Sequence, residues 1–454
     1  MLFEQQNSRL TACLHTDNLL FAKRPSSWIA LFLHRIFWKI SLMKAPTSAA
    51  DTQTPISRNR LLALSGLGWM FDAMDVGLLS FILAALQADW ALSATQMGWL
   101  GAVNSIGMAV GAMVFGMMAD RVGRKQVFVL TLLLFAAASG LSAFAGSLAV
   151  LLLLRFFIGM GLGGELPVAA TYVSERVAAH ERGRIVVLLE SFWAAGWLLA
   201  ALIAYFVMPR FAPHMGWRVA LLLGALPAIY ALYLRRKLPD DAPAAQPLAT
   251  APPLPWTARL ARLWSVEHRR ATLMLWVLWF AVVFSYYGMF LWLPSVMVGK
   301  GFALIKSFEY VLWMTLAQLP GYFTAAWLIE RMGRKFVLVA YLLGTAASAW
   351  AFGNASGQTA LLVSGALLSF FNLGAWGALY AYSPENYPAA IRASGVGTAA
   401  AVGRVGGVLG PMAIPFLNAQ GWAAGNIFAL FAGAIAIGAL AVALLGRETR
   451  GQAA

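Results

Sequence analysis

The chain has 454 residues, of which 61% are hydrophobic and only 11% are charged, and its mean hydropathy is +0.72. These values exclude an ordinary soluble globular protein, in which about 25% of the residues are charged. The formal net charge of +15 would suit a nucleic-acid-binding protein, but the basic residues are placed as in a membrane protein, so no nucleic acid is expected as a partner.

Long apolar segments recur along the chain at the length that a membrane requires. A helix needs about 20 residues to cross about 30 Å of hydrocarbon. Twelve segments of this kind are bounded by charges or turn residues: 61–86, 97–119, 127–145, 149–174, 185–206, 217–234, 272–298, 310–329, 336–353, 359–383, 394–417 and 423–445. The sequence therefore predicts an all-α membrane protein with twelve transmembrane helices, and the lipid bilayer is its expected environment.

Basic residues gather in alternate loops between these segments. The opposite loops hold only Arg210, Arg218, Lys300 and Lys306. Because Lys and Arg favour the cytoplasmic side, both termini and the long middle loop are expected to be cytoplasmic.

The first 59 residues stand apart from the twelve segments. Trp28–Met43 is apolar but is interrupted by His34, Arg35 and Lys39, so it is too short and too charged to span a membrane. Either it forms an amphipathic helix at the membrane surface, or translation begins at Met43.

Cysteine and histidine offer no cluster that would bind a metal. Cys13 is the only cysteine, and the five histidines are scattered. No disulfide, metal or cofactor is therefore expected. The chain also has no nucleotide-binding loop of the P-loop type, so ATP is not the expected energy source.

Two motifs recur at a constant spacing and divide the chain into halves. The segment 116–125 (GMMADRVGRK) is matched by 326–335 (AWLIERMGRK), and Glu175 is matched by Glu385, both at an offset of 210 residues. A proline-rich stretch separates the two copies, as is typical of a linker. The predicted parts are an N-terminal extension (1–59), a first six-helix half (60–234), a cytoplasmic linker (235–271), a second, pseudo-symmetric six-helix half (272–447) and a tail (448–454).

The motif G-x-x-x-D-R-x-G-R-K resembles that of the major facilitator superfamily, over residues 60–450. The segment 155–167 (RFFIGMGLGGELP), followed by Glu175 and Arg182, resembles its sugar-porter-like branch. The segments 71–75 (FDAMD) and 188–193 (LLESFW) are similar to bacterial niacin transporters (NiaP) and, less closely, to aromatic-acid proton symporters. The resemblance implies a monomeric transporter in the bacterial inner membrane, and not an enzyme.

The repeated motif predicts a charged gate on the cytoplasmic side. Gly116 would let its helix approach a neighbour closely, and Asp120 would cap a helix that, in the resembling family, is the eleventh. The expected ion pairs are Arg124 with Glu175 and, in the second half, Arg334 with Glu385. The gating set as a whole is Asp120, Arg124, Glu175, Arg182, Glu330, Arg334, Glu385 and Arg392. Exposed pairs of this kind contribute at most about 1 kcal/mol each, which suits contacts that break in every cycle. The alternative is that these charges only set the topology.

Six charged residues fall inside the predicted spans, where each costs about 2.5–3.5 kcal/mol unless it is paired or hydrated. Five of them are candidates for proton coupling: Asp72, Asp75, Glu165, Glu190 and Arg155. Asp72 and Asp75 share a helix face, and either could carry the proton; the alternative is a static ion pair with an arginine. Arg155 is expected to pair with an acid on the first span, whereas Glu165 and Glu190 either mark a proton exit or hold helices together.

Arg404 is the sixth intramembrane charge and the predicted substrate anchor. Its guanidinium group matches a carboxylate, and the resembling aromatic-acid carriers place an arginine on this helix. Around it, an aromatic substrate would need flat apolar walls. The candidates are Tyr286, Tyr287, Trp193, Phe71 and Trp376, with Trp197 and Tyr380 as further possibilities.

The resemblance implies a secondary transporter that imports nicotinate, or a related small aromatic carboxylate, by proton symport and alternating access. The residues alone indicate only a small, anionic, aromatic solute. The expected partners are therefore a small organic anion and protons. The alternative within the fold is an organic-cation or drug transporter, in which the acids bind substrate and Arg404 is structural. A channel or sensor would need no coupled carboxylates, and an intramembrane enzyme would need a nucleophile that the sequence does not offer.

Overall fold

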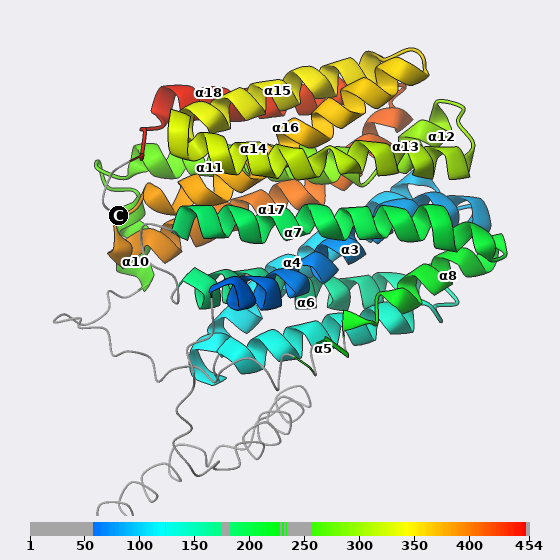
Figure 1. Cartoon of the computed structure of the whole chain (residues 1–454), viewed down its shortest axis with the longest axis horizontal. Coiled ribbons are helices and arrows are strands. Elements are labelled where there is room, and N and C mark those ends of the chain that lie inside the picture. The colour runs from blue at the N-terminus through cyan, green and yellow to red at the C-terminus, as the bar shows by residue number, and fades with distance from the viewer. Residues whose placement is uncertain are drawn as a thin grey trace, which may run out of the picture. The chain divides into compact units, whose positions relative to one another are not determined.

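The computed structural model describes residues 58–122, 124–174, 182–227, 229–230, 233 and 256–450, which belong to one compact unit, residues 56–454. The helices of the first half are α3 Arg58–Trp90, α4 Ala94–Val122, α5 Arg124–Ser142, α6 Leu148–Ser174, α7 Arg182–Leu202, the π-helix η2 Ile203–Val207, the 3₁₀-helix η3 Met208–Arg210 and α8 Pro213–Leu223. The helices that follow are α10 Trp256–Leu263, α11 Arg269–Phe290, α12 Leu293–Gly299, α13 Leu304–Leu316, α14 Gln318–Met332, α15 Arg334–Asn354, α16 Gln358–Glu385, α17 Ala389–Ala419 and α18 Ala424–Leu445. In Figure 1 the long helices run side by side, and the chain end marked C lies at the same end of the bundle as α10.

The predicted spans agree with these helices. Nine of the described helices are long and apolar enough to cross a membrane, and Leu148–Gly163 is a shorter apolar helix at the fourth predicted span. The eighth span is divided between α13 and α14, and the sixth coincides in part with α8. The all-α membrane fold is therefore confirmed.

Three spans are interrupted where proline weakens the helix. The seventh predicted span breaks after Phe290, because Pro294 has no N–H group and its ring collides with the carbonyl four residues earlier. The eighth breaks at Ala317, just before Pro320. At the end of the fifth, the α-helix widens into η2 and then tightens into η3, which contains Pro209. The seventh predicted span is thus fully broken at residues 291–292.

The predicted linker is partly helical. Residues 256–263 form α10, which packs on α17, and Thr272 donates a hydrogen bond of 2.9 Å to the carbonyl of Leu263. Leu263 is fully buried, so its side chain anchors this end of the predicted linker on the second half. Residues 235–255 and Trp28–Met43 lie outside the described part of the chain.

Glycines let neighbouring helices touch backbone to backbone. On α4, a Cβ atom at Gly107 or Gly111 would overlap a carbonyl oxygen of α6; on α6, a Cβ at Gly159 or Gly163 would overlap one of α4. Two G-x-x-x-G pairs therefore interlock, which is the close packing that the sequence favours for the fourth span. The eleventh span behaves alike, since a Cβ at Gly406 would lie 2.8 Å from the carbonyl oxygen of Phe280 on α11.

Gly116 does not act as the sequence predicts. Among the described atoms, nothing lies within 4 Å of the position that its Cβ would occupy. The close contact of α4 with α6 is made at Gly111 and Gly107, about one and a half and two and a half turns earlier on the helix. The expectation for Gly116 is therefore not met within the described residues.

We predict that Gly163→Ala destabilises the protein, because the new methyl group would overlap the Met108 carbonyl and force α4 and α6 apart. Overpacking of this kind costs about 1–3 kcal/mol. The measurement is thermal unfolding of the purified protein in detergent. Gly433→Ala on α18 is the matched control, because no described atom lies within 4 Å of its Cβ position. Equal melting temperatures for the two variants would contradict the prediction.

Candidate functional site

An ion pair lies completely buried inside the first half. Arg155 on α6 donates a hydrogen bond from Nη1 to Oδ2 of Asp75 on α3, at 2.9 Å, and both side chains are 0% exposed. Ser139 on α5 donates from Oγ to the other carboxylate oxygen at 3.1 Å. Three helices thus share one charge pair, and the expected pairing of Arg155 with an acid on the first span is present.

Arg404 lies where the two halves meet. Its Nη1 is 3.4 Å from the sulfur of Met108 on α4, and Tyr287 on α11 donates to the same sulfur at 3.7 Å. Tyr287 is also within electrostatic reach of both Arg404 and Asp72. Arg404 is only partly buried, and no described carboxylate forms an ion pair with it. The structure therefore places a cation with part of its surface open next to Tyr287, and Asp72, which is 1% exposed, acts on the same tyrosine.

An aromatic cluster, defined as Trp69, Trp193, Trp197, Tyr286, Tyr287, Phe290, Trp376 and Tyr380, adjoins this cation. Trp193 on α7 donates from Nε1 to the hydroxyl of Tyr286 on α11 at 2.7 Å, which joins the two halves directly. The Tyr286 ring lies 5.0 Å from that of Trp376 and 4.9 Å from that of Phe290. Four of the five predicted wall residues are thereby brought together. Phe71, the fifth, packs on Tyr230 with a ring separation of 5.5 Å.

Glu190 is a second buried acid near the aromatic cluster. It is 1% exposed, and its Oε2 has no hydrogen-bond partner among the described residues. The indole of Trp69 lies close to it, but the Nε1 of Trp69 does not meet hydrogen-bond geometry. Tyr322 and Tyr380 from the second half are within its electrostatic reach. The side chain of Glu165 lies outside the described part.

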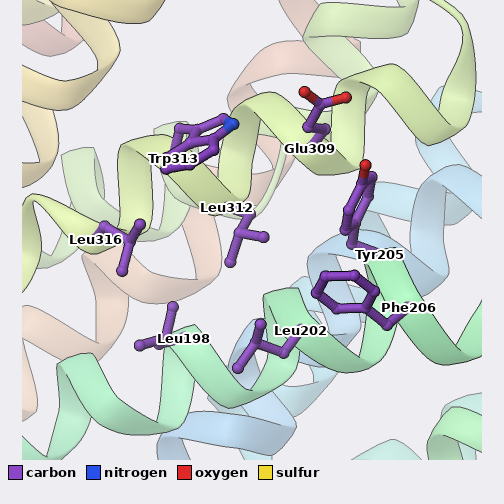
Figure 2. A pocket seen from close by; sticks show the side chains of 8 residues that line it. All are labelled: Leu198, Leu202, Tyr205, Phe206, Glu309, Leu312, Trp313 and Leu316. Atoms are coloured by element: carbon purple, nitrogen blue, oxygen red, sulfur yellow. The ribbon is translucent and has the colours of Figure 1, made fainter.

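A groove of about 350 Å³ runs between α7 with η2 and α13, as Figure 2 shows. Its lining consists of Leu198, Leu202, Tyr205, Phe206, Glu309, Leu312, Trp313 and Leu316. None of the predicted substrate or proton residues lines it. Phe206 and Trp313 are about half exposed, so the groove presents an apolar face of the kind that lipid covers.

The ion pair predicted for the second half, Arg334 with Glu385, is present and is called the latch below. Arg334 donates from Nε to Glu385 at 3.2 Å, and it also pairs with Glu330 one turn earlier at 3.4 Å. Arg392 donates to the backbone carbonyl of Tyr387 at 3.3 Å. The structure does not describe the side chains of the corresponding residues in the first half, which are Asp120, Arg124, Glu175 and Arg182.

A strap formed by residues 446–450 covers this latch, and the sequence alone did not reveal it. Glu448 accepts hydrogen bonds from the backbone N–H groups of Arg334 and Lys335, at 2.9 and 3.1 Å, and so caps the first turn of α15. Thr449 donates to Glu385, which ties the strap to the latch. Arg450 donates to the carbonyl of Arg331.

Gly333 makes room for the strap. Its φ of 98° lies in the left-handed region that favours glycine, and a Cβ there would overlap the carboxylate of Glu448. Gly333 of the repeated motif therefore leaves the space in which the Glu448 carboxylate lies.

Sequence reasoning missed Ser139, Met108 and Glu448. A serine or a methionine in an apolar helix carries no signal of its own. Glu448 could have been noticed as an acid between Arg447 and Arg450 just after the last span.

With this geometry in hand, comparison with known proteins becomes informative. The model of the Major Facilitator Superfamily matches residues 66–321 and 310–454. The chain belongs to the major facilitator superfamily. Its apolar helices and the intramembrane charges are therefore those of a multi-pass membrane transporter.

Several curated relatives are named as transporters. This superfamily member is 59% identical over 398 residues to a putative niacin/nicotinamide transporter, NiaP, of Bacillus subtilis, covering 88% of this chain and 98% of the relative. It is 47% identical over 418 residues to the niacin transporter NiaP of Acinetobacter baylyi, covering 86% and 94%. A 3-(3-hydroxy-phenyl)propionate transporter of Escherichia coli is 30% identical over 400 residues, with 87% of this chain and 96% of the relative covered.

Solved structures agree on the fold. The crystal structure of a D-xylose-proton symporter matches with a TM-score of 0.72 at 19% identity, covering 87% of this transporter and 99% of that chain. At this identity the likeness concerns the fold alone.

We predict that Glu448→Ala loosens the strap in a pH-dependent way. Partial burial raises the pKa of Glu448, but the backbone N–H groups of Arg450, Arg334, Lys335 and Thr449 outweigh it and hold the pKa below the usual 4.5. The ionised cap therefore stabilises the fold above about pH 4.5, and this contribution is lost as pH falls through the lowered pKa. Loss of a cap costs about 0.5–2 kcal/mol, and we expect the lower end because the site is partly exposed.

Thermal unfolding of wild type and Glu448→Ala at about pH 7 and about pH 3 measures this effect. The difference in melting temperature should be present at the higher pH and shrink at the lower one. Glu267→Ala, at a carboxylate that is 80% exposed, is the control. It should leave the melting temperature at the wild-type value at both pH values. A difference that is the same at both pH values would contradict the assignment.

Proposed function

We propose that this chain is a secondary transporter that imports nicotinate, or a closely related aromatic monocarboxylate, by proton symport and alternating access. The observation that carries the proposal is Arg404, a partly open cation at the junction of the two halves, beside the aromatic cluster. Transporters of this fold bind substrate between their halves, near the middle of the membrane.

Arg404 supplies the anchor for the substrate carboxylate. A guanidinium group binds a carboxylate through two parallel hydrogen bonds, which fixes both position and orientation. The rings of Tyr286 and Trp376, 5.0 Å apart at their centroids, offer flat apolar walls for an aromatic ring. A small aromatic anion could pair its carboxylate with Arg404 and pack its ring against the aromatic cluster at the same time.

The substrate assignment is further supported by the relatives. One, at 59% identity, is named as a putative niacin/nicotinamide transporter, and another, at 47% identity, as a niacin transporter. Another carries a phenylpropionate, which is again an aromatic ring with one carboxylate.

We assign proton coupling to Asp75 and Asp72 on α3. Protonation of Asp75 would remove the counter-charge of Arg155, and a lone charge in the membrane interior is strongly disfavoured. Loading a proton would thus favour a rearrangement of α3 against α5 and α6. Asp72 would connect this change to the substrate, because it and Arg404 both act on Tyr287.

The Arg334–Glu385 latch is assigned to gating at one end of the bundle. The distribution of basic residues supports a cytoplasmic location for this end and for both termini. Since its pairs are partly exposed, the latch can open and close at low cost. We take the working unit to be a monomer.

The function is tested by uptake of radiolabelled nicotinate into proteoliposomes, with and without an inward proton gradient. We expect wild type to accumulate label only with the gradient, and benzoate to compete while choline does not. Arg404→Ala should reduce uptake at least about tenfold, since an ionic hydrogen bond is worth about 1.5–3 kcal/mol. Arg210→Ala, at an exposed arginine that ends η3, should leave it unchanged. Uptake by Arg404→Ala at the wild-type level would rule out Arg404 as the substrate anchor. Competition by choline instead of benzoate would favour a transporter of organic cations.

Proton coupling is tested separately with Asp75→Asn and Asp72→Asn in the same vesicles. The variant that lacks the proton carrier should still exchange external for internal nicotinate, but should lose accumulation driven by the gradient, because exchange requires no net proton movement. Glu309→Gln, outside the site and paired with Lys306 at 2.8 Å, should retain both activities. If both aspartate variants accumulate nicotinate like wild type, neither acid carries the proton.

A further inference from the structure

Glu190 lies on the face of α7 that is turned toward the second half. It is followed on the same face by Trp193 and Trp197, three and seven residues later. Both tryptophans contact the ring of Tyr286 on α11, at centroid separations of 6.4 and 6.3 Å. One turn before Glu190, Val187 lies against Gly377 of α16. Glu190 therefore belongs to the junction between the halves.

Buried polar atoms without a hydrogen-bond partner lie at this acid and near it. The Oε2 atom of Glu190, the hydroxyl of Tyr322 and the Nε1 atom of Trp69 are all buried, and each lacks a hydrogen-bond partner among the described residues. Trp69 and Tyr322 both lie close enough to Glu190 to interact with its charge. Nearly all buried polar groups in proteins are hydrogen-bonded, so these atoms together indicate a place where a polar ligand atom binds.

Glu190 and Arg404 act on the same aromatic wall. Tyr380 is within electrostatic reach of both side chains. Its ring lies 6.1 Å from that of Trp376, which in turn lies 5.0 Å from Tyr286. Tyr380 thus lies near both a cation and an acid, and a flat molecule with two different polar groups would match this pattern.

We propose that Glu190 determines specificity by binding the ring nitrogen of a pyridine carboxylate whose carboxylate is held by Arg404. The inference deepens the proposed function and rests on it. A carboxyl group and a pyridine nitrogen share one proton in a single hydrogen bond, whichever of the two carries it. This role replaces, for Glu190, the proton-coupling role considered from the sequence.

The chemistry gives a sharp criterion, because benzoate has the same carboxylate and the same ring shape but a C–H group in place of the nitrogen. With benzoate bound, the Glu190 carboxyl would stay buried without a partner. Sites built to hydrogen-bond a polar group discriminate strongly against analogues that lack it. Nicotinate is therefore expected to bind at least about tenfold more tightly than benzoate.

The test measures the affinities of purified protein for nicotinate and benzoate by titration calorimetry, in wild type, Glu190→Leu and Glu190→Gln. Glu190→Leu should weaken nicotinate binding at least about tenfold and change benzoate binding by no more than about twofold. The preference for nicotinate over benzoate should therefore disappear. Glu190→Gln retains an N–H donor for the ring nitrogen and should keep part of the preference for nicotinate. Glu309→Gln is the control for removing an acid elsewhere and should keep the wild-type ratio.

Two results would overturn the proposal. One is equal affinity of wild type for nicotinate and benzoate, which needs no variant and so holds even if Glu190→Leu fails to fold. The other is a Glu190→Leu protein that weakens both ligands alike, as a purely structural role would do. If nicotinate binds in an Arg404-dependent way and only the ratio fails, the proposed function survives; if wild type binds neither acid, both proposals fall.

Discussion

The structure depends on one constraint, that a charged side chain in the membrane interior must be paired or enclosed within the protein. Asp75 and Arg155 meet it completely, with a 2.9 Å contact, a supporting serine and no exposure. Breaking such a pair by neutralising one partner strands the other charge, which costs several kcal/mol. Under the proposed proton coupling, protonation of Asp75 would therefore act as a switch within the first half.

The closest described helix contacts lie within the halves, although glycines also line the contact of α4 with α17, where a Cβ at Gly98 would lie 3.2 Å from the carbonyl oxygen of Pro411. Inside the first half, α4 and α6 interlock through glycines at backbone distance, and in the second half α11 and α17 do the same. Between the halves, the described contacts include the Trp193–Tyr286 hydrogen bond and the contact of Arg404 with Met108. Backbone packing resists motion, whereas side-chain contacts can be exchanged. This division suits two rigid bodies that rock about a shared site.

Much of this architecture could be predicted because its signals are local. Runs of about 20 apolar residues define spans, and the repeated motif predicted the Arg334–Glu385 latch. The buried pairing of Arg155 could be anticipated, since an isolated arginine in a membrane needs an acid. The assembly of Tyr286, Trp193 and Trp376 around one point was predicted only as a set of candidates.

What the sequence could not reveal depends on tertiary contact. The Glu448 strap joins segments more than 110 residues apart, at 113 and 114 positions of separation, and has no local signature. The same holds for Ser139 beneath Asp75. The helix breaks near Pro294 and Pro320 were visible as prolines but not as full interruptions. Among the described atoms, Gly116 has no close packing neighbour, and α4 meets α6 at Gly107 and Gly111 instead.

The central claim is that the junction between the halves, and not the lipid-facing groove, binds the substrate. An experimental structure with nicotinate bound tests it most directly. The account predicts the nicotinate carboxylate within hydrogen-bond distance of Arg404, with the ring against Tyr286 and Trp376. Ligand found in the groove between α7 and α13, or bound without any contact to Arg404, would contradict it.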